Sequence, residues 1–259
     1  MSLSANELND LKRAKALLEN PGFAAKITNL LGSPLEKGLA RLPAKISDGV
    51  QKAAHASLMK ATNVAVSSMN SNIKPESSDG FHKIAATISG AAGGMFGLAA
   101  LAIELPVSTI IMLRSISDIA RSEGEDISEM DTKLSCLSVF AIGGKSASDD
   151  ASESGYFAAR TAMASAVSEA AKYLARKGTV DATAPAVVRL ISLIASRFGI
   201  VVSEKAAAQA VPIIGAVAGA MINSIFIDHF QDMARGHFIV RRLEKKYGEE
   251  AVQLAYKEV

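Results

Sequence analysis

The sequence predicts an all-α protein that folds as one helical bundle. Apolar residues make up 49% of the chain while aromatic residues make up 5% and tryptophan is absent, a composition typical of helices that pack closely through small side chains. No segment alternates apolar and polar residues between turn signals, as a half-buried strand would. Two uncharged runs, residues 84–103 and 206–227, are rich in glycine and alanine. We expect them to form the two central helices of the bundle.

The N-terminal helix is predicted from its capping residues. Ser4 and Glu7 have the spacing of a capping box, and the helix should end before the Asn-Pro-Gly sequence at residues 20–22. Short helices interrupted by glycine and proline follow. Helical spacing then returns from about residue 46 to residue 66, before a polar loop at residues 67–80.

Pro106 predicts a corner between two helices. Proline lacks an amide hydrogen and disfavours the helical conformation at the residue before it, Leu105. We therefore expect the apolar helix to stop there and a second helix to run from Pro106 to about Ser122. Glu104 would then precede a helix N-terminus, where the helix dipole favours a carboxylate.

Four more helical segments complete the prediction. They cover residues 129–142, 156–176 and 185–198, and a charged C-terminal stretch that follows the second uncharged run. The apolar piece at residues 199–202 fits either a helix or a strand. No Pro-rich or Gly/Ser-rich linker separates domains. We divide the chain into an N-terminal helical extension (1–41), a helical domain (42–248) and a C-terminal helix (249–259).

Charge and cysteine content restrict the function. Lys and Arg number 28 against 26 Asp and Glu, a net charge of +2, which gives no overall field to attract nucleic acid. Cys136 is the single cysteine, so it can form no internal disulfide and no CxxC zinc site. The charged N-terminus lacks the apolar core of a secretory signal. We expect a cytoplasmic protein without a cofactor.

The two uncharged runs leave three interpretations open. Each run is long enough to span a bilayer, but residues 84–103 include four glycines and residues 206–227 include Pro212 and Asn223, which oppose insertion. Glycines four residues apart let helices approach closely in lipid and in a soluble core alike. The runs are therefore buried helices, spanning helices, or helices of a soluble form that rearranges at a membrane.

Three stretches of the sequence resemble the EcsC family of bacterial proteins. They are residues 97–126 (GLAALAIELPVSTIIMLRSISDIARSEGED), residues 152–160 (SESGYFAAR) and residues 198–248, and the similarity extends over residues 42–248. The resemblance implies association with membrane lipid or a membrane protein, including an accessory role beside a transporter or secretion system, with localisation at the inner membrane. It supplies no catalytic residue, because the family has no established chemical activity.

Several polar residues lie within or beside apolar segments and are candidates for a polar core. Arg114, Asp118, Arg121 and Glu125 form a stripe of charges spaced as on one helix face, which is either a solvated face or a buried seam. Tyr156 and Arg160 lie four apart, so they pack locally or bind a carboxylate or phosphate together. The full set of candidates is Glu104, Arg114, Asp118, Tyr156, Arg160, Glu204 and Lys205.

A metal site is the basis of an alternative function. Asp228, His229, Asp232 and His237 are spaced so that one helix gathers several of them on one side, and such side chains bind divalent metals in bundles. The sequence has no HExxH and no repeated ExxH. The alternatives are a metal-dependent hydrolase and a set of ion-paired structural residues.

A basic cluster near the C-terminus points to lipid. Near an anionic membrane each exposed Lys or Arg contributes about 1 kcal/mol, although a solvated helix end would carry the same residues. The residues expected to contact lipid or membrane are Arg241, Arg242, Lys245 and Lys246. Together with the resemblance, they predict a non-enzymatic membrane-associated or lipid-binding protein.

Overall fold

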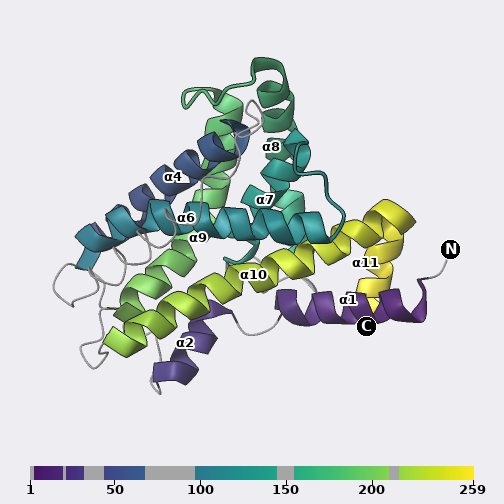
Figure 1. The fold of residues 1–259 in the computed structure, drawn as a ribbon, viewed down its shortest axis with the longest axis horizontal. Coiled ribbons are helices and arrows are strands. Elements are labelled where there is room, and N and C mark those ends of the chain that lie inside the picture. The colour runs from purple at the N-terminus through teal and green to yellow at the C-terminus, as the bar shows by residue number, and fades with distance from the viewer. Residues whose placement is uncertain (1–2, 20–21, 32–43, 68–96, 145–154, 210–215) are drawn as a thin grey trace.

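The computed structural model describes residues 3–19, 22–31, 44–67, 97–144, 155–209 and 216–259. In these residues the chain is helical, with short connections and no β-strand (Figure 1). The predicted all-α fold is therefore confirmed. The helices of the described part are α1 (Ala5–Glu19), α2 (Phe23–Leu31), α4 (Ala44–Ser67), α6 (Gly97–Ser122), α7 (Met130–Ile142), α8 (Gly155–Lys177), α9 (Pro185–Gln209), α10 (Ala216–Tyr247) and α11 (Glu249–Glu258).

Helix α10 organises the bundle. It is 32 residues long and contacts α1, α2, α6, α7, α9 and α11, while α4 packs against α6 and α9. In Figure 1, α10 crosses the molecule diagonally, with α1 below its C-terminal half and α2 below its N-terminal half. Every helix near the centre is thus positioned by a contact with α10 or with a direct neighbour of α10.

An aromatic cluster fills the contact between α10, α7 and α9. Phe140, Phe198, Phe226 and Phe230 are each at most 1% exposed, and their ring centroids lie 5.1–6.3 Å apart, several of them edge to face. Such pairs stabilise by about 0.5–1.5 kcal/mol each beyond the burial of their surface. This cluster fixes the position along α10 at which α7 and α9 pack.

The helices with strong local signals are those that the sequence predicted. The expected segments 46–66, 129–142 and 156–176 correspond to α4, α7 and α8 within two residues at each end. The capping box at α1 is also present: the Ser4 amide donates to Glu7 Oε2 at 3.0 Å, and the Glu7 amide donates to Ser4 Oγ at 3.4 Å.

The predicted corner at Pro106 is wrong. Helix α6 runs without a break from Gly97 to Ser122 and contains Pro106, so Glu104 lies inside a helix. A proline in a helix interior costs about 3 kcal/mol, and packing offsets this cost. Leu105 next to it is fully buried, and the Thr109 hydroxyl donates to the Leu105 carbonyl at 2.7 Å.

The predicted end of the helix at Phe198, before Gly199, is also wrong. Helix α9 continues to Gln209. A Cβ on Gly199 would lie 2.4 Å from the Gln51 side chain of α4. The glycine therefore permits a close approach of two helices and does not end one.

The two uncharged runs differ from the prediction or fall outside the described residues. The described parts of residues 206–227 belong to two helices, since α9 extends to Gln209 and α10 begins at Ala216. Residues 84–96 lie outside the described part of the chain. The expected pairing of two Gly/Ala-rich helices at the centre is consequently outside what the structure describes.

Candidate functional site

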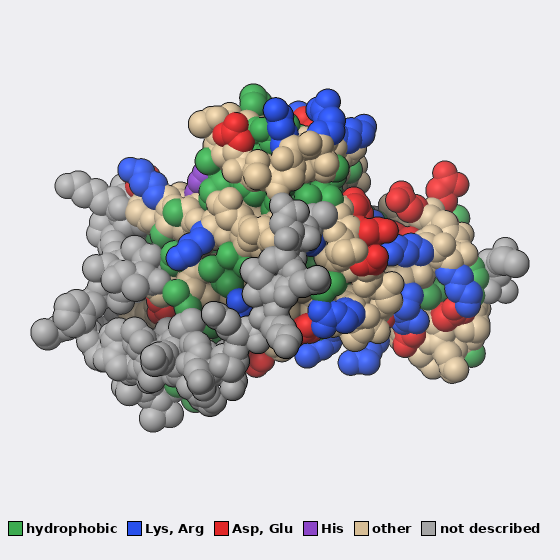
Figure 2. Space-filling view, turned by 45° about the horizontal axis from the view of Figure 1, so that its top comes forward, with side chains coloured by type: hydrophobic (Ala, Val, Ile, Leu, Met, Phe, Trp, Pro, Cys, Tyr) green, Lys and Arg blue, Asp and Glu red, His purple; other side chains and the backbone are tan. Residues whose placement is uncertain are grey.

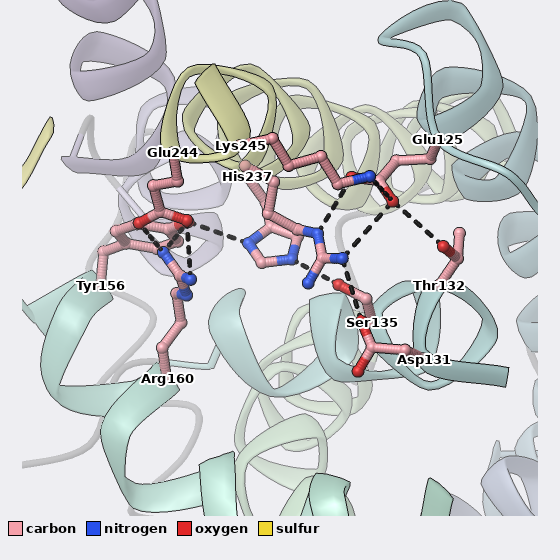
Figure 3. A network of polar contacts seen from close by, with 10 residues as sticks. Glu125, Asp131, Thr132, Ser135, Tyr156, Arg160, His237, Glu244 and Lys245 are labelled. Carbon is pink, nitrogen blue, oxygen red and sulfur yellow. Dashed lines mark hydrogen bonds and ion pairs between the residues drawn. The ribbon is translucent and has the colours of Figure 1, made fainter. Parts of the chain in front are cut away.

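Polar side chains from four parts of the chain meet beside the C-terminal half of α10 (Figure 3). We call this group the polar network. It brings together α10, α8, α7 and the connection between α6 and α7. Its members are Glu125, Asp131, Thr132, Ser135, Tyr156, Arg160, His237, Arg241, Glu244 and Lys245.

His237 occupies the middle of the polar network. It is 3% exposed, and its ring nitrogens contact two hydroxyls: Nε2 lies 2.8 Å from Ser135 Oγ and Nδ1 lies 2.9 Å from the Tyr156 hydroxyl. Burial, followed by the positive charges of Arg160 and Arg241, lowers the pKa of His237 well below its ordinary value. The imidazole is therefore neutral, so one nitrogen donates and the other accepts.

Arg160 connects α8 to α10 at one side of His237. Its two terminal nitrogens donate to the two Glu244 oxygens at 2.7 and 2.9 Å, and one of them also donates to the Tyr156 hydroxyl at 3.2 Å. A bidentate arrangement of this kind is strong and directional. Tyr156 and Arg160 do act together, as their spacing indicated, and the carboxylate that Arg160 holds is the chain's own Glu244.

Glu125 forms the other side of the polar network. Its side chain is 1% exposed and accepts hydrogen bonds from Arg241 at 3.1 Å and from Thr132 at 3.0 Å, while Lys245 lies at 3.0 Å. Burial raises the pKa of Glu125, but hydrogen bonds from Arg241 and Lys245 outweigh burial, and the pKa lies below its ordinary value. The buried carboxylate is thus ionised, and the neighbouring cations balance its charge.

The C-terminal basic cluster is paired with carboxylates. The ion pairs join Arg241 to Glu125 and Asp131, Arg242 to Asp10 and Glu123, Lys245 to Glu125, and Lys246 to Glu7, at 2.7–3.1 Å. Four cations thus face five carboxylates. Acidic and basic side chains are interspersed over this part of the molecule, at the right of Figure 2. The cluster does not form a free positive patch.

A second buried ion pair joins α6 to α9. Lys205 Nζ lies 2.7 Å from Glu104 Oε1, with side chains 1% and 17% exposed, and it stands 4.6 Å from the centroid of the Phe226 ring on α10. Burial lowers the pKa of Lys205, and the charge of Glu104 partly opposes this shift. Two of the predicted polar core residues are therefore partners.

Glu204 points away from this pair, toward α2. It is half-buried and accepts a hydrogen bond from the Ala24 amide in the first turn of α2, and burial raises its pKa to about 7. A carboxylate at this position satisfies an amide that has no partner within its own helix. The docking of α2 therefore depends on a group that titrates near neutral pH.

Docking of α2 should weaken as the pH rises. The pKa of Glu204 is raised from 4.5 to about 7 in the folded protein, so the stability that it contributes is complete below pH 4.5 and is lost as the pH passes 7. We expect Glu204→Gln, which keeps the acceptor oxygen, to raise the free energy of unfolding by about 2 kcal/mol at pH 9 and to leave it unchanged at pH 5. Urea denaturation at both pH values measures this; an equal effect at the two pH values would contradict it.

The metal-ligand candidates do not converge. Asp228 is exposed, His229 Nε2 lies 2.9 Å from the Gly143 carbonyl, and Asp232 forms ion pairs with Lys26 and Arg235. His237, the fourth candidate, belongs to the polar network. Across the described residues no group of three or more His, Cys, Asp or Glu side chains is arranged to hold a metal ion.

The first charged stripe splits in two. Arg114 and Asp118 are exposed, and Asp118 pairs with Arg121 one turn away at 3.0 Å. The prediction that these two residues belong to a polar core is wrong, and the interpretation as a solvated helix face is right for them. Glu125, at the end of the same stripe, lies beyond α6 and is buried.

Sequence reasoning did not select Glu244 or Ser135. Glu244 lies 84 residues from Arg160, and Ser135 lies 102 residues from His237, so no local pattern joins the partners. One signal was present: His237, Arg241 and Glu244 recur at intervals of four and three, which places them on one face of α10.

Comparison with known proteins identifies the family. The model of the EcsC protein family matches residues 5–243 of the chain. This protein belongs to the EcsC family. The EcsC match includes α1 and α2, takes in every residue of the polar network except Glu244 and Lys245, and ends before α11. A search of curated proteins and a search of solved structures found no match.

One described helix of this EcsC protein meets the length and composition of a membrane span. Helix α9 is 25 residues long, its most apolar window has a mean hydropathy of 1.8, and half of that window is buried inside the protein. Core helices of soluble proteins share these properties.

Proposed function

We propose that this EcsC protein is a non-enzymatic protein that associates with membranes and binds lipid or a membrane protein through its apolar helices. The observation that carries the proposal is the apolar character of α9, which is only half covered within the described bundle. The uncharged sequence continues beyond α9 as far as residue 227.

The pairing of the buried polar groups supports a non-enzymatic role. A catalytic centre keeps some groups directed at the substrate. In the polar network, Arg160 is bound to Glu244, Glu125 is bound to two cations, and His237 contacts a hydroxyl at each nitrogen. These contacts hold α8, α7 and α10 together. The hydrolase alternative has no comparable support, since its four candidate residues have separate partners.

The ion pairs of the basic cluster favour apolar over electrostatic membrane contact. A free pair of lysines near an anionic surface would contribute about 2 kcal/mol, or about thirtyfold in affinity. Lys245 and Lys246 each already face a carboxylate. Lipid phosphate would have to compete with Glu125 and Glu7 for them.

Vesicle flotation of detergent-free protein tests the proposal. We expect flotation with neutral and with anionic liposomes that survives high salt, because salt screens exposed charges but does not weaken apolar contact. Lys245→Gln with Lys246→Gln should lower the affinity for anionic vesicles by less than about threefold. The matched control, Lys172→Gln with Lys177→Gln, removes two exposed charges from α8.

Two outcomes would contradict bilayer contact through the apolar helices. Flotation that disappears at high salt, together with a large loss in the Lys245/Lys246 variant but not in the control, would assign membrane contact to the basic cluster. Absence of flotation with either liposome would exclude direct bilayer binding under these conditions, and a membrane protein would then be sought as the partner.

A further inference from the structure

The partners of His237 determine which of its ring nitrogens carries the proton. Arginine only donates, so the Tyr156 oxygen accepts a hydrogen bond from Arg160 at 3.2 Å. The single hydroxyl hydrogen of Tyr156 is then directed at His237 Nδ1, 2.9 Å away. In the reverse arrangement this oxygen would meet hydrogens from Arg160 and His237 together, and its own hydrogen would have no acceptor among the described residues. Nδ1 is therefore the acceptor, and the Nε2–H group donates to Ser135 Oγ at 2.8 Å.

The charged groups around His237 already balance one another. They are Arg160 from α8, Glu125 and Asp131 from the connection to α7 and from α7, and Arg241, Glu244 and Lys245 from α10. These three cations and three carboxylates are paired with one another. Behind Tyr156 follow Tyr256 of α11, which is stacked on it, and Lys15 of α1, which lies over the Tyr256 ring. A proton added to His237 would therefore meet no carboxylate without a partner in this group.

The contacts of His237 oppose a second ring proton. His237 lies between the Arg160 side and the Glu125 side of the polar network (Figure 3). Protonation would turn Nδ1 into a donor that faces the Tyr156 hydroxyl, whose oxygen is already occupied by Arg160. It would also add a buried positive charge near the guanidinium groups of Arg160 and Arg241, which together with burial keep the pKa of His237 low. The closed arrangement thus requires the neutral imidazole.

The first two turns of α8 depend on these contacts for their attachment to α10. Helix α8 packs on α7 and α9, and it reaches α10 through Tyr156 and Arg160, which contact His237 and Glu244. The Tyr156 ring also lies against Tyr256 of α11. A change of charge at His237 therefore acts directly on the N-terminal end of α8.

We propose that His237 is an acid-sensitive switch between α8 and α10. Protonation of Nδ1 breaks its hydrogen bond with Tyr156, and the first two turns of α8 move away from α10, so that water reaches the imidazolium. The opening exposes the rings of Tyr156 and Tyr256, which are buried in the closed form. This switch goes beyond the proposed membrane association and does not depend on it.

The switch operates below about pH 6.5. An exposed histidine takes up a proton near pH 6.5, whereas the pKa of buried His237 lies well below that value. The closed form is therefore fully favoured above pH 6.5 and loses about tenfold in its equilibrium per pH unit below it. Glu125 stays ionised at pH 5, because its pKa is lowered from 4.5. Glu204, with a pKa of about 7, becomes protonated in the same interval, which strengthens the docking of α2.

Nitrogen NMR of histidine-labelled wild-type protein tests the position of the proton. The His237 ring is assigned by through-bond correlation to its own backbone. At pH 7 we expect Nδ1 to show the chemical shift of an unprotonated ring nitrogen and Nε2 that of a protonated one. The opposite pattern, or an imidazolium at pH 7, would overturn the proposal.

Hydrogen exchange followed by mass spectrometry tests the opening. After correction for the intrinsic effect of pH, exchange of residues 156–163 should rise by up to about thirtyfold between pH 7 and pH 5, while exchange of residues 185–198 in α9 stays nearly constant. His237→Gln has no titrating ring and should abolish the rise. The matched control is His55→Gln, which removes a half-buried histidine of α4 and should keep the rise.

Two results would contradict the opening. Exchange of residues 156–163 in the wild type that is the same at pH 7 and pH 5 would overturn the proposal, and this result does not require any variant to fold. A rise that persists in His237→Gln, with circular dichroism showing that the variant is folded, would also overturn it, because another group would then be responsible.

Discussion

Replacing Glu104 by alanine is expected to lower the free energy of unfolding by about 3–5 kcal/mol. The substitution would leave the Lys205 ammonium, which is 1% exposed, without its carboxylate. A buried charge that loses its partner keeps the full cost of dehydration. Urea denaturation followed by circular dichroism measures the loss.

The double variant Glu104→Leu with Lys205→Met is the matched control. It removes both charges and keeps similar volumes, so we expect a stability within about 1 kcal/mol of the wild type or above it. Lys205→Met alone should cost less than Glu104→Ala, because the Glu104 side chain is 17% exposed and can be hydrated. A loss below about 1 kcal/mol in Glu104→Ala would mean that the ion pair does not form.

Gly144→Ala should cause the second large loss. A Cβ on Gly144 would lie 2.1 Å from the Arg197 carbonyl oxygen and 2.6 Å from its carbonyl carbon. Because both atoms are backbone atoms, the end of α7 would have to move away from α9, and the hydrogen bond from Arg197 Nε to the Ala141 carbonyl, 2.9 Å long, would stretch. We expect a cost of about 3 kcal/mol from overpacking, measured as the shift of the urea midpoint.

Gly49→Ala separates this steric effect from the general effect of replacing glycine. Gly49 lies in α4, and no heavy atom would come within 4 Å of its added Cβ. Alanine is favoured over glycine in helices by about 1 kcal/mol, so this variant should be more stable than the wild type. Equal destabilisation of the two variants would show that the close approach at Gly144 is not the cause.

The helices that could be predicted carry their signals locally. Helix α7 ends at the Gly143-Gly144 pair, and α1 begins with the reciprocal bonds of Ser4 and Glu7. The predictions of a helix end at Pro106 and at Gly199 were wrong for one common reason. Each was assigned its usual effect on an isolated helix, whereas α6 and α9 are held by neighbours, and packing overrides propensity.

The candidate site was less predictable than the fold. The candidate residues Tyr156 and Arg160 were correctly paired because they lie one turn apart. The partner of Arg242, Asp10, lies 232 residues away, and that of Lys246, Glu7, lies 239 residues away. A sequence shows how many charges of each sign exist, but only the fold decides which of them meet.

The dominance of α10 has a consequence for biosynthesis. Helix α1 packs against α10 and α11, and α2 packs against α10 and α9; the polar contacts that fasten them, such as Lys26 to Asp232 and Lys15 to Val259, join residues 206 to 244 positions apart. Helices α1 and α2 are synthesised before α9, α10 and α11, so both emerge from the ribosome without the surfaces that cover them in the folded protein. Contacts of such separation close slowly. The nascent chain therefore keeps the apolar faces of α1 and α2 exposed until these later helices have been made, a period in which chaperones or a nearby bilayer can engage it.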